Sequence, residues 1–249
     1  MRKRKGYFIT FEGGEGVGKS TQIQFAASYL RKIFRNVGAY CNTPLLILRE
    51  PGSTKIGEAI REILLDSRNR KMSVETELFL YLAARAQLVC EVIQPALRAG
   101  KVVICDRFED STMVYQRYAV GVTRRIARTS LMQMFKIARG EIIPDLTFLL
   151  DVDVKEGLKR SGRKDRMEHK SLRFHERIRR GYLRLAKENP KRIVVISTKA
   201  AKEVVKERIE ETLKRVFLRA SLRGSATLLG GDEAVFKHRD CFAQRARND

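Results

Sequence analysis

The sequence predicts an α/β fold in which a five-stranded parallel sheet carries helices on both faces. Five short apolar runs alternate along the chain with longer segments whose apolar residues recur at helical spacing. A glycine-rich loop separates the first run from the first helical segment. Strands that alternate with helices favour a parallel sheet, because a connection between parallel strands must carry the chain back to the same edge. The 249 residues, 43% of them apolar, suffice for one such domain.

The elements follow one another in a regular order. Strands are expected from Tyr7 and over residues 45–49, 101–105, 145–152 and 192–197, and helices over 19–36, 56–65, 74–98, 123–138 and up to about 217. Residues 1–217 therefore form the predicted domain. Residues 218–249 show no sustained periodicity and have scattered charges and glycines, which is typical of a disordered or loosely attached tail.

The loop after the first strand has the spacing of a Walker A phosphate loop. Gly13, four further residues and then Gly18, Lys19 and Ser20 match G-x-x-x-x-G-K-[ST]. Backbone N–H groups of such a loop and the following helix dipole bind phosphate. The Lys19 ammonium is expected on the β- and γ-phosphates, and the Ser20 hydroxyl on Mg²⁺. The expected nucleotide-binding residues are Gly13, Gly14, Glu15, Gly16, Val17, Gly18, Lys19, Ser20 and Thr21.

Two other strands also end in polar residues. Arg49 closes the second strand and begins the segment REPGST, and Asp106 and Arg107 follow the third. The carboxyl ends of parallel strands are where open α/β sheets bind ligands. An acidic residue in the place of Asp106 suits a Walker B role that holds Mg²⁺ or its waters, and Arg107 suits a phosphate clamp. A strand-end ion pair is the simpler explanation of an Asp-Arg pair.

Charge is the outlier in the composition. Lys and Arg number 51 against 29 Asp and Glu, a net charge of +22, which predicts attraction to polyanions without saying which. Between Lys155 and Arg192, fifteen basic residues stand against five acidic ones. A solvated basic helix face explains part of this excess.

Cysteine spacing and hydropathy indicate the cellular compartment of the protein. The cysteines Cys41, Cys90, Cys105 and Cys241 are too widely spaced for a disulfide framework or a metal motif, which indicates a reducing compartment. No apolar run reaches the ~20 residues of a membrane helix, and MRKRK does not lead into a signal-peptide core. We therefore expect a soluble cytoplasmic protein.

Four separated motifs together resemble one family. FEGGEGVGKST, LREPGST, the pair YLAAR and DRFEDSTMVYQ, and RSGRKDRME stand in the order and context of the bacterial thymidylate kinases. These are P-loop nucleoside monophosphate kinases with a short lid, here about residues 159–168. The similarity extends from about Lys5 to Arg215. It implies transfer of the ATP γ-phosphoryl group to dTMP in dTTP biosynthesis, Mg²⁺ as cofactor, a homodimer, and no need for nucleic acid or a membrane.

The resemblance also implies roles for individual residues in binding dTMP. Tyr81 matches the ring that stacks on thymine, and Arg85, one helical turn later, matches the arginine that hydrogen-bonds the base. Thr112 matches a contact to the base edge, and Tyr115 the ring that crowds the 2′ position of the sugar. The full set expected to contact dTMP is Arg49, Tyr81, Arg85, Arg107, Ser111, Thr112, Tyr115 and Gln116.

The catalytic roles implied by the family are divided between the phosphate loop and the lid. Glu15 matches a loop carboxylate near the sugar 3′-hydroxyl and the acceptor phosphate. In members without a cation inside the loop, lid arginines supply charge to the transition state. The implied catalytic residues are Lys19, Glu15, Arg107 and Arg163, with Arg160 and Arg166 on ATP and Ser20 and Asp106 on the metal. The Glu50–Pro51 bond is cis by the same resemblance.

Some features depart from the family or admit simpler explanations. The family commonly has Gln-Gly-x-Gly-Arg-Gly where this chain has residues 116–121, QRYAVG. Taken singly, Arg85 has a simpler explanation as a surface ion-pair partner, and Tyr81 has one as an ordinary core residue. Two rival functions stay open: a kinase for another monophosphate or small metabolite, and a nucleic-acid-binding ATPase or GTPase, which the charge of +22 favours.

Overall fold

Five parallel strands form one sheet in the order β2-β3-β1-β4-β5. The computed structural model describes residues 6–36, 45–120, 126–162, 166 and 170–222. The strands are β1 (Tyr7–Glu12), β2 (Leu45–Arg49), β3 (Val102–Asp106), β4 (Leu146–Asp151) and β5 (Ile193–Ser197). The predicted parallel sheet is confirmed, and the strand bounds differ from the expected ones by at most a residue or two at an end.

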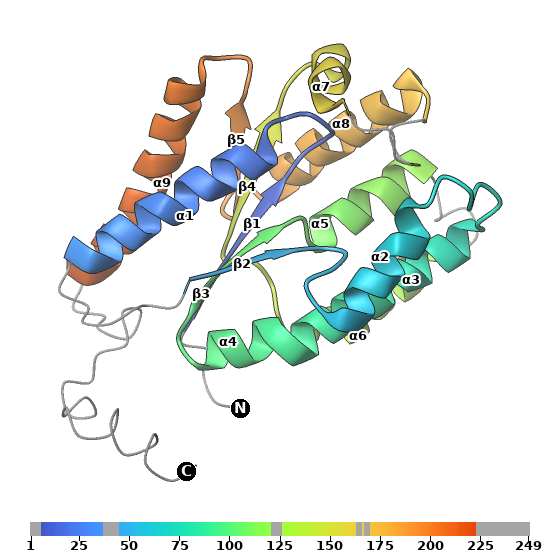
Figure 1. The fold of residues 1–249 in the computed structure, drawn as a ribbon, viewed down its shortest axis with the longest axis horizontal. Coiled ribbons are helices and arrows are strands. Elements are labelled where there is room, and N and C mark those ends of the chain that lie inside the picture. Colours follow the sequence, from blue (N-terminus) through green and yellow to red (C-terminus); the bar gives the residue numbers. More distant parts are fainter. Residues whose placement is uncertain (1–5, 37–44, 121–125, 163–165, 167–169, 223–249) are drawn as a thin grey trace, which may run out of the picture.

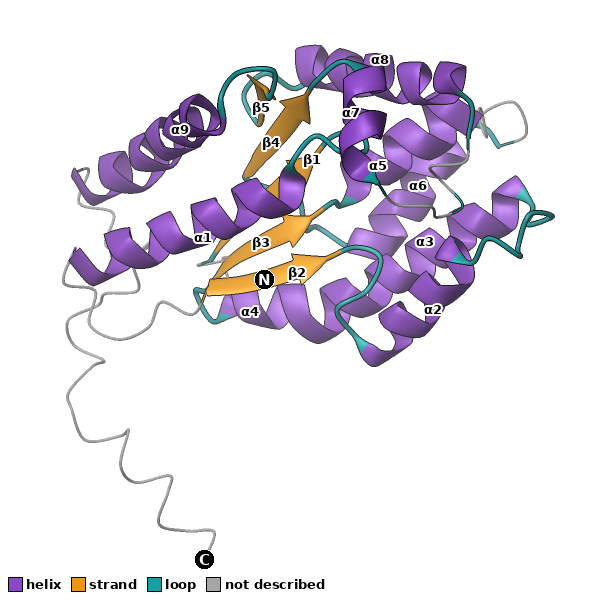
Figure 2. Ribbon diagram, turned by 45° about the horizontal axis from the view of Figure 1, so that its top comes forward, coloured by secondary structure: helices purple, strands orange, loops and turns teal. Residues whose placement is uncertain are grey.

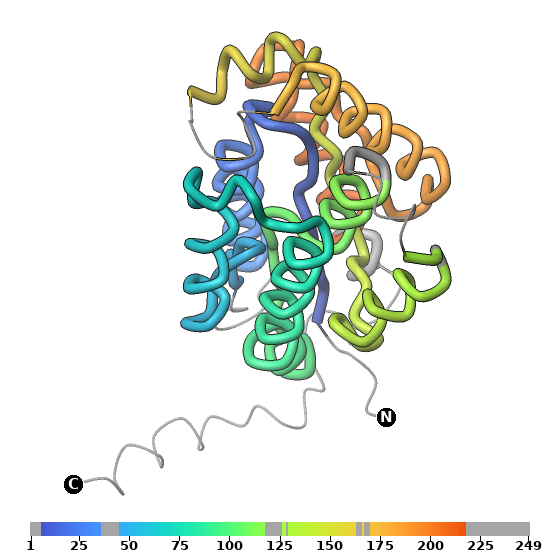
Figure 3. The backbone as a smooth tube through the Cα atoms, turned by 90° about the vertical axis from the view of Figure 1, so that its right-hand side faces the viewer, coloured from blue at the N-terminus to red at the C-terminus, as the bar shows by residue number. Residues whose placement is uncertain are grey.

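Helices connect the strands and cover both faces of the sheet (Figure 1). They are α1 (Lys19–Asn36), α2 (Lys55–Leu65), α3 (Val74–Leu88), η1 (Val89–Ile93), α4 (Gln94–Arg98), α5 (Glu109–Thr112), η2 (Met113–Val120), α6 (Arg128–Arg139), α7 (Val154–Ser161), α8 (Leu172–Glu188) and α9 (Lys202–Leu222). Helix α2 packs beside α3 (Figure 3). None of the described helices has both the length and the apolar character needed to cross a membrane.

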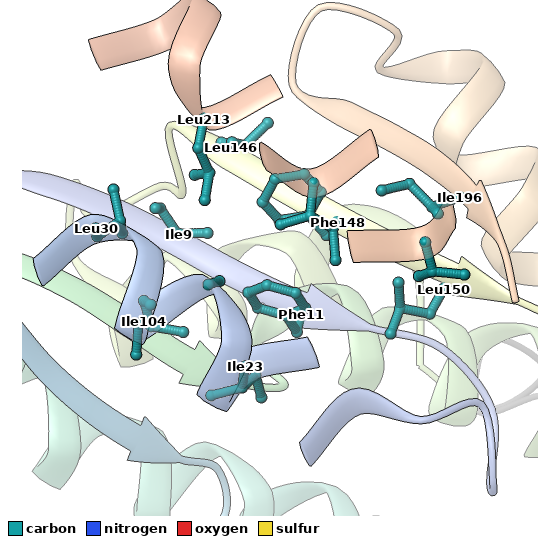
Figure 4. Packing of buried hydrophobic residues seen from close by; sticks show 14 of the residues in the cluster. Ile9, Phe11, Ile23, Leu30, Ile104, Leu146, Phe148, Leu150, Ile196 and Leu213 are labelled. Atoms are coloured by element: carbon teal, nitrogen blue, oxygen red, sulfur yellow. The ribbon is translucent and has the colours of Figure 1, made fainter. Parts of the chain in front are cut away.

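Alternation along β1 sends side chains to two different cores. Ile9 and Phe11 point toward α1 and α9, where they meet Leu30 and Leu213 (Figure 4). Phe8 faces the opposite side and packs with residues of α3, η1 and α4. Burial on both faces explains why the strands are almost uniformly apolar. By the same alternation, Phe8, Thr10 and Glu12 lie on one side of the strand. Glu12 is therefore inside the protein, at 0% exposure.

Four features of the observed helices differ from the predicted ones. The helix expected over 74–98 is continuous but contains the π-helical turn η1 just before Pro95, which lacks an N–H and cannot complete the regular ladder. Residues 109–120 form two further helical segments, α5 and η2, which lie outside the expected helices. Helix α6 begins at 128 instead of 123, and residues 121–125 lie outside the described part of the chain.

Helix α9 is the fourth difference, because it extends past residue 217 to Leu222. Residues 218–222 contain no glycine or proline, and Gly224 is the first such residue beyond them. The boundary expected between domain and tail therefore falls inside a helix. The remaining tail, residues 223–249, lies outside the described residues. Cys90 and Cys105, the two described cysteines, are free thiols.

Candidate active site

A cavity of 770 Å³ opens at the carboxyl ends of the strands. Figure 2 shows the arrowheads of the strands pointing toward this edge, where α5 and α7 lie. Its wall contains the loops after β1, β2, β3 and β5. The expected site residues that line it are Glu15, Gly16, Val17, Gly18, Lys19, Ser20, Thr21, Arg49, Tyr81, Asp106, Arg107, Ser111, Thr112, Tyr115 and Arg160.

The phosphate loop forms one end of the cavity. Lys19 begins α1, and its ammonium donates to the carbonyl oxygens of Gly14 at 2.8 Å and Gly13 at 3.3 Å. Burial, followed by the charge of Arg107, lowers the pKa of Lys19 to about 8. A bound phosphate would supply the negative charge that this buried cation lacks. The loop is therefore organised to receive an anion beside Lys19.

The loop touches α7 directly, backbone against backbone. Gly16 has φ of +65°, and a Cβ atom there would lie 1.8 Å from the carbonyl oxygen of Gly157. A Cβ atom on Gly157 would in turn lie 2.5 Å from the carbonyl oxygen of Glu15. Only two glycines allow this approach. The helix that carries Arg160 is thus seated against the phosphate loop.

Arg107 lines the cavity at the end of β3. It adopts φ of 70° in the turn between β3 and α5. Its guanidinium pairs with Glu15 at 2.7 Å and donates to the Gly13 carbonyl at 3.0 Å and to the hydroxyls of Ser111 and Tyr182 at 3.2 Å each. The left-handed backbone is unfavourable for arginine, and these contacts hold it in place.

Glu15 accepts the hydrogen bond that the Arg107 guanidinium donates. Tyr115 also donates to its carboxylate, at 2.9 Å. Burial opposes the charge of Glu15, but Arg107, Lys19 and the Tyr115 hydroxyl together lower its pKa to about 2. Glu15 is therefore ionised at neutral pH and available to accept a further hydrogen bond. Arginine, tyrosine and carboxylate form one rigid wall of the cavity.

Glu12 and Tyr182 complete this wall from behind, although the sequence analysis did not single them out. Glu12 accepts hydrogen bonds from the Phe108 N–H at 2.7 Å, Ser111 at 2.6 Å and Tyr182 at 3.1 Å. Burial, and then the charge of Asp110, raise the pKa of Glu12 to about 8. A glutamate that ends a buried strand was a usable signal for Glu12. Tyr182 lies in α8, and nothing nearby in sequence marks it.

The raised pKa of Glu12 predicts a pH dependence of stability. A group that holds its proton more tightly in the folded protein contributes most below its unfolded pKa, and this contribution is lost as pH rises from about 4.5 toward 8. Glu12→Gln should remove that loss, because the amide imitates the protonated carboxyl group. The difference in melting temperature, variant minus wild type, should therefore be larger at about pH 8 than at about pH 5. The same difference in melting temperature at both pH values would contradict this prediction.

Asp106 and Ser20 are the residues expected to hold a metal. Both line the cavity, and the Asp106 Oδ1 atom is buried with no hydrogen-bond partner among the described residues. No group of three or more His, Cys, Asp or Glu side chains suited to a metal ion occurs in the described part of the chain. Mg²⁺ usually takes few protein ligands and completes its shell with water and phosphate. One carboxylate and one hydroxyl fit that pattern.

Another part of the cavity wall is built by α3 and the loop after β2. Arg85 is completely buried, pairs with Glu50 and donates to the Thr112 hydroxyl at 2.6 Å. This excludes the simpler explanation of Arg85 as a surface ion-pair partner. Its Nη1 atom is buried without a partner among the described residues. Tyr81 lines the cavity, and the Glu50–Pro51 bond is cis as the resemblance implied.

Several expected residues do not line the cavity. Gly13 and Gly14 present carbonyl groups to Lys19 from behind the loop, and Arg85 and Gln116 are wholly buried. Arg166 pairs with Glu77 of α3 and donates to the Leu64 carbonyl at 2.9 Å. The structure thus places Arg166 beside α2 and α3 instead of beside the phosphate loop. Arg163 lies outside the described residues.

The remaining cations differ in their surroundings. Arg160 lines the cavity, pairs with Glu156 and donates to the Thr198 carbonyl at 3.2 Å. Arg49 pairs with Glu58 at 2.7 Å, and its side chain is 55% exposed. Both are partly free to reorient toward a ligand, because their partners lie near solvent.

The parallel sheet, the phosphate loop and the cavity beside Lys19 together define a phosphate-loop nucleotide-binding protein. A family model described as thymidylate kinase matches residues 11–209. Because the match covers most of the chain, the protein belongs to the thymidylate kinase family, and it is a kinase.

Similar proteins agree with this assignment. A thymidylate kinase of Geobacter sulfurreducens is 49% identical over 200 residues, which are 77% of this chain and 88% of that protein. A thymidylate kinase of Desulfovibrio desulfuricans is 43% identical over 222 residues, 84% of this chain and 97% of that one. The crystal structure of thymidylate kinase from Ehrlichia chaffeensis has a TM-score of 0.65 at 32% identity and covers 84% of this chain and 98% of its own.

Proposed function

We propose that the protein transfers the γ-phosphoryl group of ATP to the 5′-phosphate of dTMP and so produces dTDP for dTTP synthesis. The observation that carries this proposal is a single cavity that is lined by Lys19 of the phosphate loop, by Tyr81 of α3 and by Arg107 at the end of β3. Phosphoryl transfer needs in-line positioning and neutralisation of charge, without a covalent enzyme intermediate. Several cations that line one shared cavity meet that need.

The donor half binds the triphosphate. N–H groups of residues 13–21 surround the phosphates, and Lys19 leaves its carbonyl partners for the β- and γ-phosphates. Mg²⁺, held by Ser20 and Asp106, would neutralise the β- and γ-phosphate oxygens when bound. The unpartnered oxygen of Asp106 supports this assignment.

The acceptor half positions the attacking oxygen. Arg107 and Arg49 bind the 5′-phosphate as bidentate cations, and the ion pair with Glu15 keeps Arg107 oriented. Glu15 accepts a hydrogen bond from the 3′-hydroxyl. The Tyr115 ring, held by its bond to Glu15, fills the space that a 2′-hydroxyl would need. The pocket therefore favours a deoxyribose monophosphate.

The base is recognised on the far side of the cavity. Tyr81 stacks on it, and Thr112, Ser111 and Gln116 belong to the segment that faces its edge. Arg85 contributes its free Nη1 atom as a donor. Arg160 and Arg163 supply positive charge to the transferring phosphoryl group from the lid, whereas the contact with Glu77 supports an acceptor-side role for Arg166.

A panel of acceptors tests this function directly. ATP is incubated with dTMP, dUMP, dCMP, dGMP, dAMP and AMP, with and without added DNA, and the diphosphates are quantified. We expect the highest kcat/KM for dTMP and no requirement for DNA. Preference for another monophosphate would show that this compound, and not dTMP, is the substrate. Hydrolysis of ATP only in the presence of DNA would favour the nucleic-acid-dependent ATPase.

Removing the Tyr81 ring should weaken binding of dTMP alone. Tyr81→Ala is expected to raise KM for dTMP about tenfold and leave KM for ATP unchanged, because stacking and burial of the ring contribute roughly 1 to 2 kcal/mol. Initial-rate kinetics with each substrate varied in turn measure both constants. Tyr81→Phe keeps the ring and should behave like the wild type. An equal rise in both KM values would place the acceptor base elsewhere.

Arg85 is a poorer choice for the same test. Its guanidinium is buried against Glu50, so Arg85→Ala leaves an uncompensated buried carboxylate and should cost about 3–5 kcal/mol of stability. Loss of activity in that variant would report unfolding as much as recognition.

We further propose a cytoplasmic homodimer. Large apolar side chains exposed on α2, α3 and α6 support the dimer: Ile56, Ile63, Phe79, Met132 and Ile137. The free thiols of Cys90 and Cys105 support a reducing compartment. Sedimentation equilibrium of the full chain measures the oligomeric state, and a monomer at micromolar concentration would refute the dimer.

A further inference from the structure

Three buried polar side chains from distant segments meet behind the acceptor half of the cavity. Glu77 lies in α3, Gln116 in η2, which packs against α3, and Arg166 follows α7. Their exposures are 6%, 0% and 8%. Gln116 Nε2 donates to Glu77 Oε1 at 2.6 Å, and Arg166 Nη2 pairs with Glu77 Oε2. Both carboxylate oxygens of Glu77 therefore have a donor.

This arrangement determines which way the Gln116 amide faces. An ionised carboxylate only accepts hydrogen bonds, so the amide must turn its NH₂ group toward Glu77. Arg166 keeps a permanent positive charge beside that carboxylate. The Gln116 Oε1 atom is then directed elsewhere, and it is buried with no donor among the described residues. A buried acceptor without a donor is unfavourable unless a ligand supplies one.

Each member of the cluster has a neighbour in the cavity wall. Glu77 precedes Tyr81 by one helical turn, and Gln116 directly follows Tyr115. Arg166 donates to the backbone of Leu64, whose neighbour Leu65 lines the cavity. The cluster therefore adjoins three segments of the cavity wall.

A second unpartnered atom lies in the same wall. The Nη1 atom of Arg85 is a buried donor without a partner among the described residues, and Arg85 bonds to Thr112, one turn before Gln116. Arg85 and Gln116 do not line the cavity themselves, but each adjoins a lining residue, Thr112 and Tyr115 respectively. The layer behind the wall thus holds one free donor and one free acceptor. The edge of thymine offers the complement, O4 as acceptor and N3–H as donor. Cytosine offers the reverse, an amino donor and N3 as acceptor.

We propose that Glu77 is a positioning residue for base specificity: its carboxylate, held by Arg166, fixes the Gln116 amide so that its oxygen faces the N3–H of the base. Glu77 itself does not touch the substrate. It excludes cytosine because the fixed amide oxygen would oppose the lone pair of N3. This inference rests on the proposed dTMP kinase function. Uracil shares the thymine edge and is not excluded by Glu77.

A double-mutant cycle tests whether Glu77 acts through Gln116. Glu77→Gln, Gln116→Met and the double variant are compared by KM for dTMP, KM for ATP, the kcat/KM ratio of dTMP to dCMP, and melting temperature. Each single variant should raise KM for dTMP on the order of tenfold and lower the dTMP preference, with KM for ATP unchanged. The double variant should be no worse than Gln116→Met alone. Additive effects would overturn the proposal.

Exchanging the charges of residues 77 and 166 separates the orientation of the Gln116 amide from the stability that the ion pair provides. Glu77→Arg combined with Arg166→Glu restores an ion pair, but an arginine at 77 can only donate, so the Gln116 amide must turn its oxygen inward. We expect the melting temperature to recover relative to the single variants while KM for dTMP stays high. Recovery of both would show that the ion pair alone matters.

The matched control is an ion pair remote from the base. Glu188→Ala removes the carboxylate that Arg184 contacts at 2.9 Å on α8, and it should leave KM for dTMP and the dTMP preference unchanged. A wild-type enzyme that fails to phosphorylate dTMP would overturn the proposed function and this inference together. Additive kinetics in an active enzyme would overturn only the inference.

Discussion

Lys19→Ala should abolish phosphoryl transfer while the fold persists. The ammonium is the only part of Lys19 that the proposed chemistry uses, and loss of a preorganised charge on the transferring group should lower kcat on the order of 10³-fold or more. Stability should not fall at neutral pH. Burial lowers the pKa of Lys19 to about 8, so the folded protein disfavours this charge and loses little when it is removed.

Two further variants complete that experiment. Lys19→Met keeps the length of the side chain without its charge and should be as inactive as Lys19→Ala. Lys32→Ala changes an exposed lysine of the same helix and should be fully active. Coupled-assay rates and thermal unfolding are measured on the same samples. Substantial activity in Lys19→Met, or loss of the fold in both Lys19 variants, would refute the assigned role.

Gly157→Ala should damage both stability and catalysis, against the usual helix preference. In a helix interior, alanine is normally more stable than glycine by roughly 0.5–1 kcal/mol. Here the new Cβ would lie 2.5 Å from the Glu15 carbonyl oxygen, so α7 or the phosphate loop must move. Overpacking of this kind costs about 1–3 kcal/mol, and displacement of the loop by about 1 Å should lower kcat on the order of 10²-fold.

Lys155→Ala provides the control for helix propensity. Lys155 is exposed on the same helix, and its replacement should leave kcat unchanged and the melting temperature level or slightly higher. The comparison uses calorimetric melting temperatures and kcat at saturating substrates. A Gly157→Ala enzyme that is more stable and equally active would show that the contact between α7 and the loop has room to relax.

The sheet, the order of its elements and the phosphate loop could be predicted from sequence because their signals are local. A buried parallel strand such as β4 must be apolar throughout, and a loop that binds phosphate needs glycines and a lysine at fixed spacing. The same locality placed Asp106 and Arg107 at the end of β3, beside the cavity. Helix ends were less certain, as the start of α6 shows.

Partners of buried charges could not be predicted in this way. Glu12 and Tyr182 are 170 positions apart, and Glu77 and Arg166 are 89 apart. Sequence motifs assigned Arg166 to ATP, whereas the structure pairs it with a carboxylate of α3. Motif spacing records which residue types are present, but the partner of a charge depends on distances through space and on which groups lose their water.

By itself, then, the sequence determined an α/β protein of the thymidylate kinase family with a phosphate loop after its first strand, because periodicity and motif spacing are properties of neighbouring residues. Tertiary structure alone decided that Glu12 and Tyr182 support Arg107, that Gly16 and Gly157 touch, and that Arg166 faces Glu77. Those contacts arise only when segments distant in sequence are brought together by burial of the sheet, and desolvation then selects the charges that must be paired.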